Sequence, residues 1–193
     1  MLISQDIEII QLIPNHLKKP EQEIHLYDRD LGQQLRQEIE HIISSSRKKA
    51  VFYLDFKGID SIDFSCADEL IGKLISRLLT NEYGDIFFVL KNLNDNQLEN
   101  IQVALDRRKV ACLRCGTNSE CQLLGYTKNY LTEMLEIISQ KGKITARELS
   151  EALNLELNTS STRLSHLHKA HLVHREQILV NGGGREYLYH KLI

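Results

Sequence analysis

The stretch that decides the fold is DFKGIDSIDFSCADEL, residues 55–70. The apolar, β-prone run 51–56 leads into it and is stopped by Gly58, so a buried central strand is predicted there. After the loop, Ser65 and Asp68 have the spacing of a capping box, in which a serine hydroxyl accepts a backbone N–H of the first helical turn. The sequence therefore predicts a strand, an exposed loop and a helix that Ser65 opens.

Strand and helix patterns alternate on both sides of this stretch, which is typical of an α/β layered fold. Towards the N-terminus, residues 6–13 and 23–27 alternate apolar and polar side chains around two prolines, and we expect them to form an antiparallel edge pair. Asp30 is the predicted cap of a helix over 31–45. Towards the C-terminus we expect a strand over 85–90, a helix over 96–108, and strands over 110–114 and 120–124 joined by the turn Gly116-Thr117-Asn118.

A strand, a loop and a serine at a helix start also resemble the STAS fold, the domain of sulfate transporters and anti-sigma factor antagonists. The resemblance is closest to a STAS-like branch of unassigned function, and the matching residues are Asp55, Phe56, Gly58, Ser65, Ala67, Asp68, Glu69, Gly72, Lys73 and Leu74. It implies a mixed sheet with helices, no catalytic activity, and a regulatory serine at Ser65 flanked by Asp63 and Asp68. Partner-switching members of the family carry Asp-Ser-Ser-Gly where this chain has Asp63-Phe64-Ser65-Cys66, so Ser65 is either a plain helix cap or a phosphoacceptor.

Length and composition limit what can accompany this element. The 193 residues, 42% of them apolar, are enough for one medium core or two small ones. No apolar run has membrane-spanning length and the first residues lack the basic start of a signal peptide, so we expect a soluble, cytoplasmic protein with no membrane partner. Residues 1–125 carry 15 Lys/Arg against 19 Asp/Glu, whereas residues 126–193 carry 9 against 7 and five of the eight histidines. Two domains are therefore predicted, 1–125 and 126–193.

The second half has the pattern of three helices followed by a β-hairpin. Leu131, Leu135 and Ile138 predict a first helix near 128–140, and Thr145 with Glu148 forms a capping box for a second. The cluster Asn158-Thr159-Ser160 is the predicted cap of a third helix that runs to about His171. Strands over 177–180 and 185–189 are expected to flank a turn over 181–184.

This half resembles the winged helix-turn-helix of bacterial regulators of the multiple-antibiotic-resistance type. The matching residues are Ile144-Thr145-x-x-Glu148-Leu149-Ser150 for the second helix, residues 161–168 for the third, and Gly184-Arg185 for the wing. The resemblance implies that the protein binds double-stranded DNA as a homodimer.

The third helix is the predicted DNA-reading element, because residues 157–175 include no acidic residue and are rich in hydroxyl and cationic side chains. Arg185, beside the wing glycines, is expected to reach a flanking minor groove. In the alternative, the polar helix is only solvated and the winged helix docks a protein. The residues predicted to bind DNA are Asn158, Thr159, Ser160, Ser161, Thr162, Arg163, His166, Lys169, Arg175 and Arg185.

The sequence offers weaker signals for other chemistry. The four cysteines are expected to be reduced thiols. Cys112, Cys115 and Cys121 are interpreted as buried small hydrophobes, with a redox or zinc site as the alternative, and the histidines of the third helix lack a complete metal-ligand set. No phosphate-cradling glycine motif is present, so neither an enzyme nor a cofactor is predicted.

Together these features predict a cytoplasmic transcription regulator, in which a STAS-like sensing or partner-binding domain is fused to a DNA-binding winged helix. The alternative is a protein–protein partner switch, in which Ser65 is phosphorylated by a histidine-kinase-like ATPase of the anti-sigma type.

Overall fold

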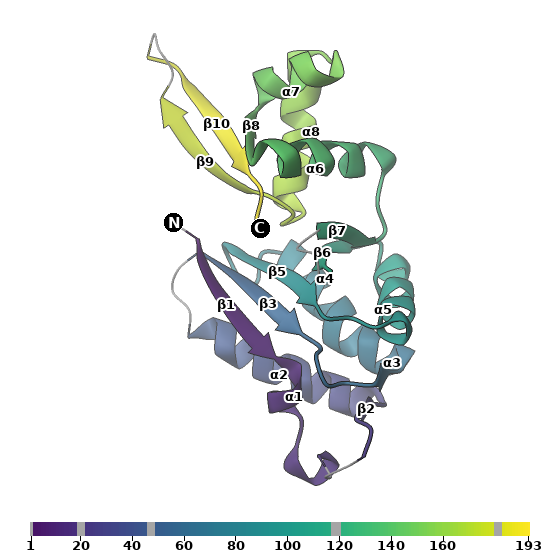
Figure 1. The fold of residues 1–193 in the computed structure, drawn as a ribbon. Helices are drawn as coiled ribbons and strands as arrows, with labels where there is room; N and C mark the ends of the chain where they lie inside the picture. Colours follow the sequence, from purple (N-terminus) through teal and green to yellow (C-terminus); the bar gives the residue numbers. More distant parts are fainter. Residues whose placement is uncertain (1, 19–21, 46–48, 117–120, 180–182) are drawn as a thin grey trace. The chain divides into compact units, whose positions relative to one another are not determined.

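The structure is a computed structural model that describes residues 2–18, 22–45, 49–116, 121–179 and 183–193. Within these residues the chain forms two compact units, unit 1 (Met1–Thr127) and unit 2 (Lys128–Ile193). Figure 1 follows the chain through both. The predicted mixed α/β class is confirmed, with a winged helix region at the C-terminal end. The turns expected at 117–118 and 181–182 lie outside the described residues.

Unit 1 is built on a five-stranded sheet with the strand order β1-β3-β5-β6-β7. The first four strands run parallel to their neighbours, and β7 closes the far edge antiparallel to β6. The predicted central strand is confirmed, because β3 pairs on both sides and the side chains of Phe52 and Leu54 are fully buried. The strands are β1 (Ile3–Glu8), β3 (Ala50–Asp55), β5 (Ile86–Lys91), β6 (Ala111–Cys115) and β7 (Cys121–Gly125).

Helices pack against this sheet, and Figure 1 shows α2 and α4 behind the strands and α5 beside them. The apolar stripe of each helix meets the inward side chains of the strands, which forms the main core of the unit. Asn94 and Gln97 form a reciprocal capping box at the start of α5, so this helix begins close to its predicted position. The longer helices are α2 (Arg29–Ser44), α4 (Lys73–Leu79) and α5 (Asp95–Arg108).

The N-terminal segment differs from the expected antiparallel edge pair. β1 runs parallel to β3, with Ile7 opposite Leu54, and the chain continues as the short helix α1 (Ile9–Leu12). β2 (His25–Leu26) pairs in parallel with β4 (Ser61–Ile62), away from β1. The prediction was wrong because local alternation identifies extended segments but does not identify their partners, and pairing with a buried strand completes more hydrogen bonds.

The helix that was predicted to begin at Ser65 is capped by Asp63 instead. Asp63 Oδ1 accepts the N–H of Cys66 at 2.7 Å, and its Oδ2 accepts the N–H of Asp28 at 3.2 Å. Ser65 therefore lies inside the first turn of α3 (Phe64–Ala67). The predicted Ser65–Asp68 capping box was wrong, because the Asp68 carboxylate instead forms an ion pair with Arg108.

Between α3 and α4 lies the π-helical segment η2 (Asp68–Gly72), all of whose residues are buried. Its two acidic residues point to different neighbours. Asp68 Oδ2 accepts from Arg108 Nη2 of α5 at 2.7 Å, and the Glu69 carboxylate contacts Arg29 Nη1 at 3.1 Å and Arg36 Nη2 at 3.7 Å, both from α2. Lys73 also pairs with Glu69. Both buried acids are thus neutralised by cations on adjacent elements.

The first turns of α2 pack closely against α3. Asp28, not Asp30, is its N-cap, and Asp28 Oδ1 accepts the N–H of Leu31 at 2.9 Å. Asp28 has φ 68° and ψ 163°, a combination that few residues other than glycine adopt. A Cβ at Gly32 would lie 2.7 Å from the carbonyl oxygen of Cys66, so only glycine lets the two helices approach this closely.

Unit 2 consists, in its described part, of three helices and a three-stranded antiparallel sheet in the order β8-β10-β9. Its small core is apolar and includes Met134, Ile138, Leu149, Leu164, Leu167 and Tyr189. The elements are α6 (Asn129–Lys141), β8 (Lys143–Thr145), α7 (Ala146–Leu153), α8 (Leu157–Lys169), β9 (His174–Leu179) and β10 (Arg185–His190).

Candidate nucleic-acid interface

Helices α7 and α8 form the helix-turn-helix, and their ends are set by local signals. The predicted capping box of α7 is confirmed: Glu148 N–H donates to Thr145 Oγ1 at 3.2 Å, and Thr145 N–H donates to Glu148 Oε2 at 2.7 Å. α7 ends at Asn154, which adopts the left-handed conformation of a C-terminal cap. α8 then begins after Glu156, so the cap expected at residues 158–160 was wrong, and these residues lie within the first helical turn instead.

α8 has one buried face and one polar face. Ser160, Leu164 and Leu167 are fully buried against the rest of the unit. Asn158, Thr162, Ser165 and Lys169 follow the spacing i, i+4, i+7, i+11, which places them in a row on the opposite face. Asn158, Thr162 and Lys169 are exposed, and Ser165 is half-buried. A helix with this polar row can present amide, hydroxyl and ammonium groups to base edges and phosphates.

Ser160 must be removed from the predicted set of DNA contacts. Its side chain has no exposed surface, and its Oγ has no hydrogen-bond partner within the described residues. One helical turn separates it from Leu164, which explains why it points into the core. Its neighbours Thr159 and Ser161 are half-buried and exposed, respectively.

Arg163 lies on the flank of α8, against α6. Its guanidinium carbon is 4.9 Å from the centre of the Tyr130 ring, within the range of a cation–π contact. The hydroxyl of Tyr130 is also 3.5 Å from Nδ1 of His166, one turn away on α8. Tyr130 therefore holds two of the predicted DNA-binding side chains from a second helix, which reduces the conformational freedom that each would lose on binding.

The wing is formed by β9 and β10, which pair antiparallel. Arg175 on β9 stacks on Tyr187 of β10, with 4.3 Å from its guanidinium carbon to the ring centre. Arg185, the first residue of β10, is exposed and stands two positions after Gly183, which has a φ of 83°. Glu176 Oε1 lies 2.9 Å from His190 Nε2, so this acid is engaged within the hairpin.

The sequence named Arg163, Arg175 and Arg185 as candidate DNA contacts, but it did not point to the two tyrosines on which Arg163 and Arg175 pack. Tyr130 stands 33 positions before Arg163, and Tyr187 stands 12 positions after Arg175. The only available signal is the strand pattern of the hairpin, which places Arg175 and Tyr187 near one another in register. No comparable signal links α6 to α8.

A match to a known family covers the helices of this candidate interface but not its wing. A family model described as winged helix-turn-helix DNA-binding matches residues 131–174. These residues form a winged helix-turn-helix DNA-binding domain. The match runs from α6 through the helix-turn-helix to the first residue of β9. The search of curated proteins returned no match to this chain.

Unit 1 contains the predicted regulatory residues. Ser65 is half-buried in the first turn of α3, Asp63 caps that turn, and Asp68 is buried in its ion pair with Arg108. Burial, together with the nearby carboxylates of Asp63 and Asp28, raises the pKa of the adjacent Cys66 thiol to about 12. The helix start therefore presents a hydroxyl near backbone N–H groups and beside an existing negative charge.

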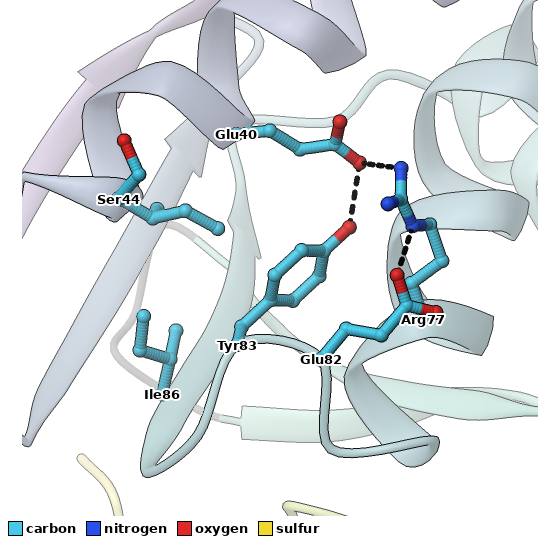
Figure 2. A pocket seen from close by; sticks show the side chains of 7 residues that line it. Glu40, Ser44, Arg77, Glu82, Tyr83 and Ile86 are labelled. Atoms are coloured by element: carbon cyan, nitrogen blue, oxygen red, sulfur yellow. Dashed lines mark hydrogen bonds and ion pairs between the residues drawn. The ribbon is translucent and has the colours of Figure 1, made fainter.

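A shallow pocket of about 290 Å³ lies between α2, α4 and the start of β5. Figure 2 shows Glu40 facing Arg77 and Tyr83: its Oε1 accepts hydrogen bonds from Arg77 at 2.7 Å and from the hydroxyl of Tyr83 at 2.6 Å. The bond from Arg77 to Glu82 lowers the pKa of that glutamate, and burial and Glu40 raise the pKa of Tyr83. The charged groups of the pocket thus bind one another.

Two further observations concern membranes and metals. Across the described ranges, each helix is too short or too polar to cross a membrane. The same residues contain no group of three His, Cys, Asp or Glu side chains arranged to hold a metal ion.

Proposed function

We propose that this protein is a DNA-binding regulator in which α8 reads the major groove and the β9–β10 wing contacts the flanking backbone. The observation that carries the proposal is the polar face of α8, where a row from Asn158 to Lys169 stands opposite the apolar core face and includes no acidic residue. Such a face can approach phosphates without charge repulsion. Ser160 is excluded from this proposed face.

Unit 1 is proposed to sense a signal or bind a protein partner, in keeping with its resemblance to STAS-like domains. Regulators of this kind read symmetric operators as homodimers, because one recognition helix contacts only a few base pairs. We therefore propose a homodimer on a pseudo-palindromic site.

The test is binding of fluorescently labelled double-stranded DNA at two salt concentrations, measured by anisotropy. Removal of two phosphate contacts by Arg163→Ala with Arg185→Ala is expected to lower the slope of log affinity against log salt by about 1.8, since each contact contributes about 0.9. Lys141→Ala is the matched control, because it removes one exposed cation from the end of α6 and should leave the slope unchanged. A double variant that binds as tightly as the parent at both salt concentrations would show that DNA does not contact this face.

The second candidate function is a partner switch, and the half-buried position of Ser65 in the first turn of α3 favours it. A phosphate there would meet the positive end of the helix and add about −1.5 to −2 charges to the surface. The proposed modifying enzyme is a histidine-kinase-like ATPase. Ser65→Asp is expected to fold normally and to change partner or DNA affinity, while Ser65→Ala is expected to prevent the change in affinity that phosphorylation brings. If both variants bind like the parent, and Ser65 carries no phosphate in protein isolated from cells, this role is refuted.

A further inference from the structure

Two cysteines at the edge of the unit 1 sheet lie directly opposite one another. Cys115 is the last residue of β6, Cys121 is the first residue of β7, and the antiparallel register pairs them. Their Sγ atoms are 2.7 Å apart. A disulfide bond is about 2.05 Å long, so the two sulfurs need to approach by only about 0.65 Å to bond.

The backbone is also suited to such a bond. Directly opposed residues of an antiparallel pair have Cα atoms about 4.5 or 5.5 Å apart, and disulfides span Cα distances of about 4.4 to 6.8 Å. Both side chains are half-buried, so a small solute can reach them. The pair also closes the end of the β6–β7 hairpin, where a bond would be accommodated without displacing a central strand.

The surroundings distinguish this pair from the other two cysteines. Cys112 also belongs to β6 but is buried in the core on the opposite face, as expected for an odd spacing from Cys115, and Cys66 is fully buried in α3. Lys91 stands beside Cys115 in the register with β5, and its charge favours the thiolate. Burial and the neighbouring Cys121 act in the other direction and raise the pKa of Cys115 to about 12.

We propose that Cys115 and Cys121 form a redox-active dithiol, which hydroperoxides convert into an intramolecular cross-strand disulfide. In the first step one thiolate attacks the peroxide oxygen, which breaks the O–O bond, forms a sulfenic acid and releases an alcohol, or water when the oxidant is hydrogen peroxide. In the second step the other thiol attacks the sulfenic sulfur, forms the S–S bond and releases water. The peroxide is reduced by two electrons and the two thiols are oxidised by two.

The chain provides a direct assay for this bond. Trypsin cleaves after Arg114 and Lys128, so both cysteines fall in the peptide 115–128, while Cys112 and Cys66 fall in other peptides. A second cleavage after Glu120 separates Cys115 from Cys121, and the two fragments then remain together only if a disulfide joins them. The full-length protein is treated with hydrogen peroxide, blocked with an alkylating reagent, digested and weighed by mass spectrometry.

We expect the linked fragments to accumulate at least about tenfold faster than any oxidation of Cys112, because Cys112 is buried whereas Cys115 and Cys121 are half-buried, and access controls the rate. A dithiol reductant should restore both thiols, and Cys112→Ser should leave the reaction unchanged. The proposal is overturned if Cys115 and Cys121 are alkylated as fully as Cys112 after peroxide treatment, or if they are oxidised to sulfinic acids without linkage. It is also overturned if the disulfide joins two molecules, which a non-reducing gel separates by mass. The assay contains no DNA, so its result is independent of the proposed DNA binding.

Discussion

The helix start at Asp63 can be tested directly, because the structure predicts that substitution of Asp63 destabilises unit 1 and that substitution of the nearby Ser65 does not. Asp63→Ala removes the acceptor of the Cys66 N–H, worth about 1 kcal/mol for an N-cap, and the acceptor of the Asp28 N–H, worth about 0.5 kcal/mol at its longer distance. The expected loss is about 1.5 kcal/mol in the free energy of unfolding of unit 1. Ser65→Ala should change this free energy by less than about 0.5 kcal/mol, because Ser65 does not cap the helix.

Asp63→Asn is the matched control. Asparagine caps a helix about as well as aspartate, but its amide group would face the Asp28 N–H in place of an oxygen, so only about 0.5 kcal/mol should be lost. Urea unfolding of the full-length protein followed by far-ultraviolet circular dichroism measures all three variants, and hydrogen exchange of the Cys66 amide reports the cap directly. If Ser65→Ala destabilises the protein as much as Asp63→Ala does, the cap has been assigned to the wrong residue.

Three further predictions concern stability. Fragments 1–125 and 127–193 should each melt cooperatively in calorimetry, and non-cooperative melting of both would show that they share a core. Leu164→Ala should cost about 2 to 5 kcal/mol in fragment 127–193, because Leu164 is fully buried, whereas Thr162→Ala on the exposed face should cost less than about 0.5 kcal/mol; similar losses would contradict the assignment of the two faces of α8. Burial raises the pKa of Cys112 from 9.0 to about 12, so the unfolded chain loses this proton first and the free energy of unfolding should fall as pH rises from about 9 to about 12. Cys112→Ala should flatten that fall by roughly 1.4 kcal/mol per pH unit, and an unchanged slope would indicate that the thiol titrates normally in the folded protein.

Most elements of both units could be predicted from local signals. The apolar run of β3 and the capping boxes at Thr145 and Asn94 each depend on a few adjacent residues, and a single pattern identifies them. The choice between neighbouring caps could not be predicted in this way. Asp28 and Asp30, or Asp63 and Ser65, have similar capping ability, and the path of the preceding loop decides which side chain faces the free N–H groups.

Contacts between distant segments of the chain also could not be predicted from the sequence. β1 pairs with β3 across more than 40 residues, and nothing in either strand specifies this partner over β2. At the candidate interface, the polar face of α8 follows from periodicity, but Ser160 was assigned to the cap because the expected helix start, at residues 159–161, was two to four residues late. The contact of Tyr130 with Arg163 depends on the packing of α6 beside α8, which no local pattern encodes.

The π-helical segment η2 bears on how this chain can tolerate change in length. A π-turn accommodates one residue more than an α-turn, so Asp68–Gly72 corresponds to a single insertion within an otherwise regular helix from Phe64 to Leu79. The extra residue rotates everything before it by about 100° relative to everything after it. Deleting one residue here would restore a regular helix, and the buried side of α4, with Leu74 and Leu78, would turn by about 100° relative to the buried Cys66 and Ala67 of α3. The irregular turn thus keeps both halves of this helix facing one core, and the chain should tolerate a one-residue deletion here less well than in an exposed loop.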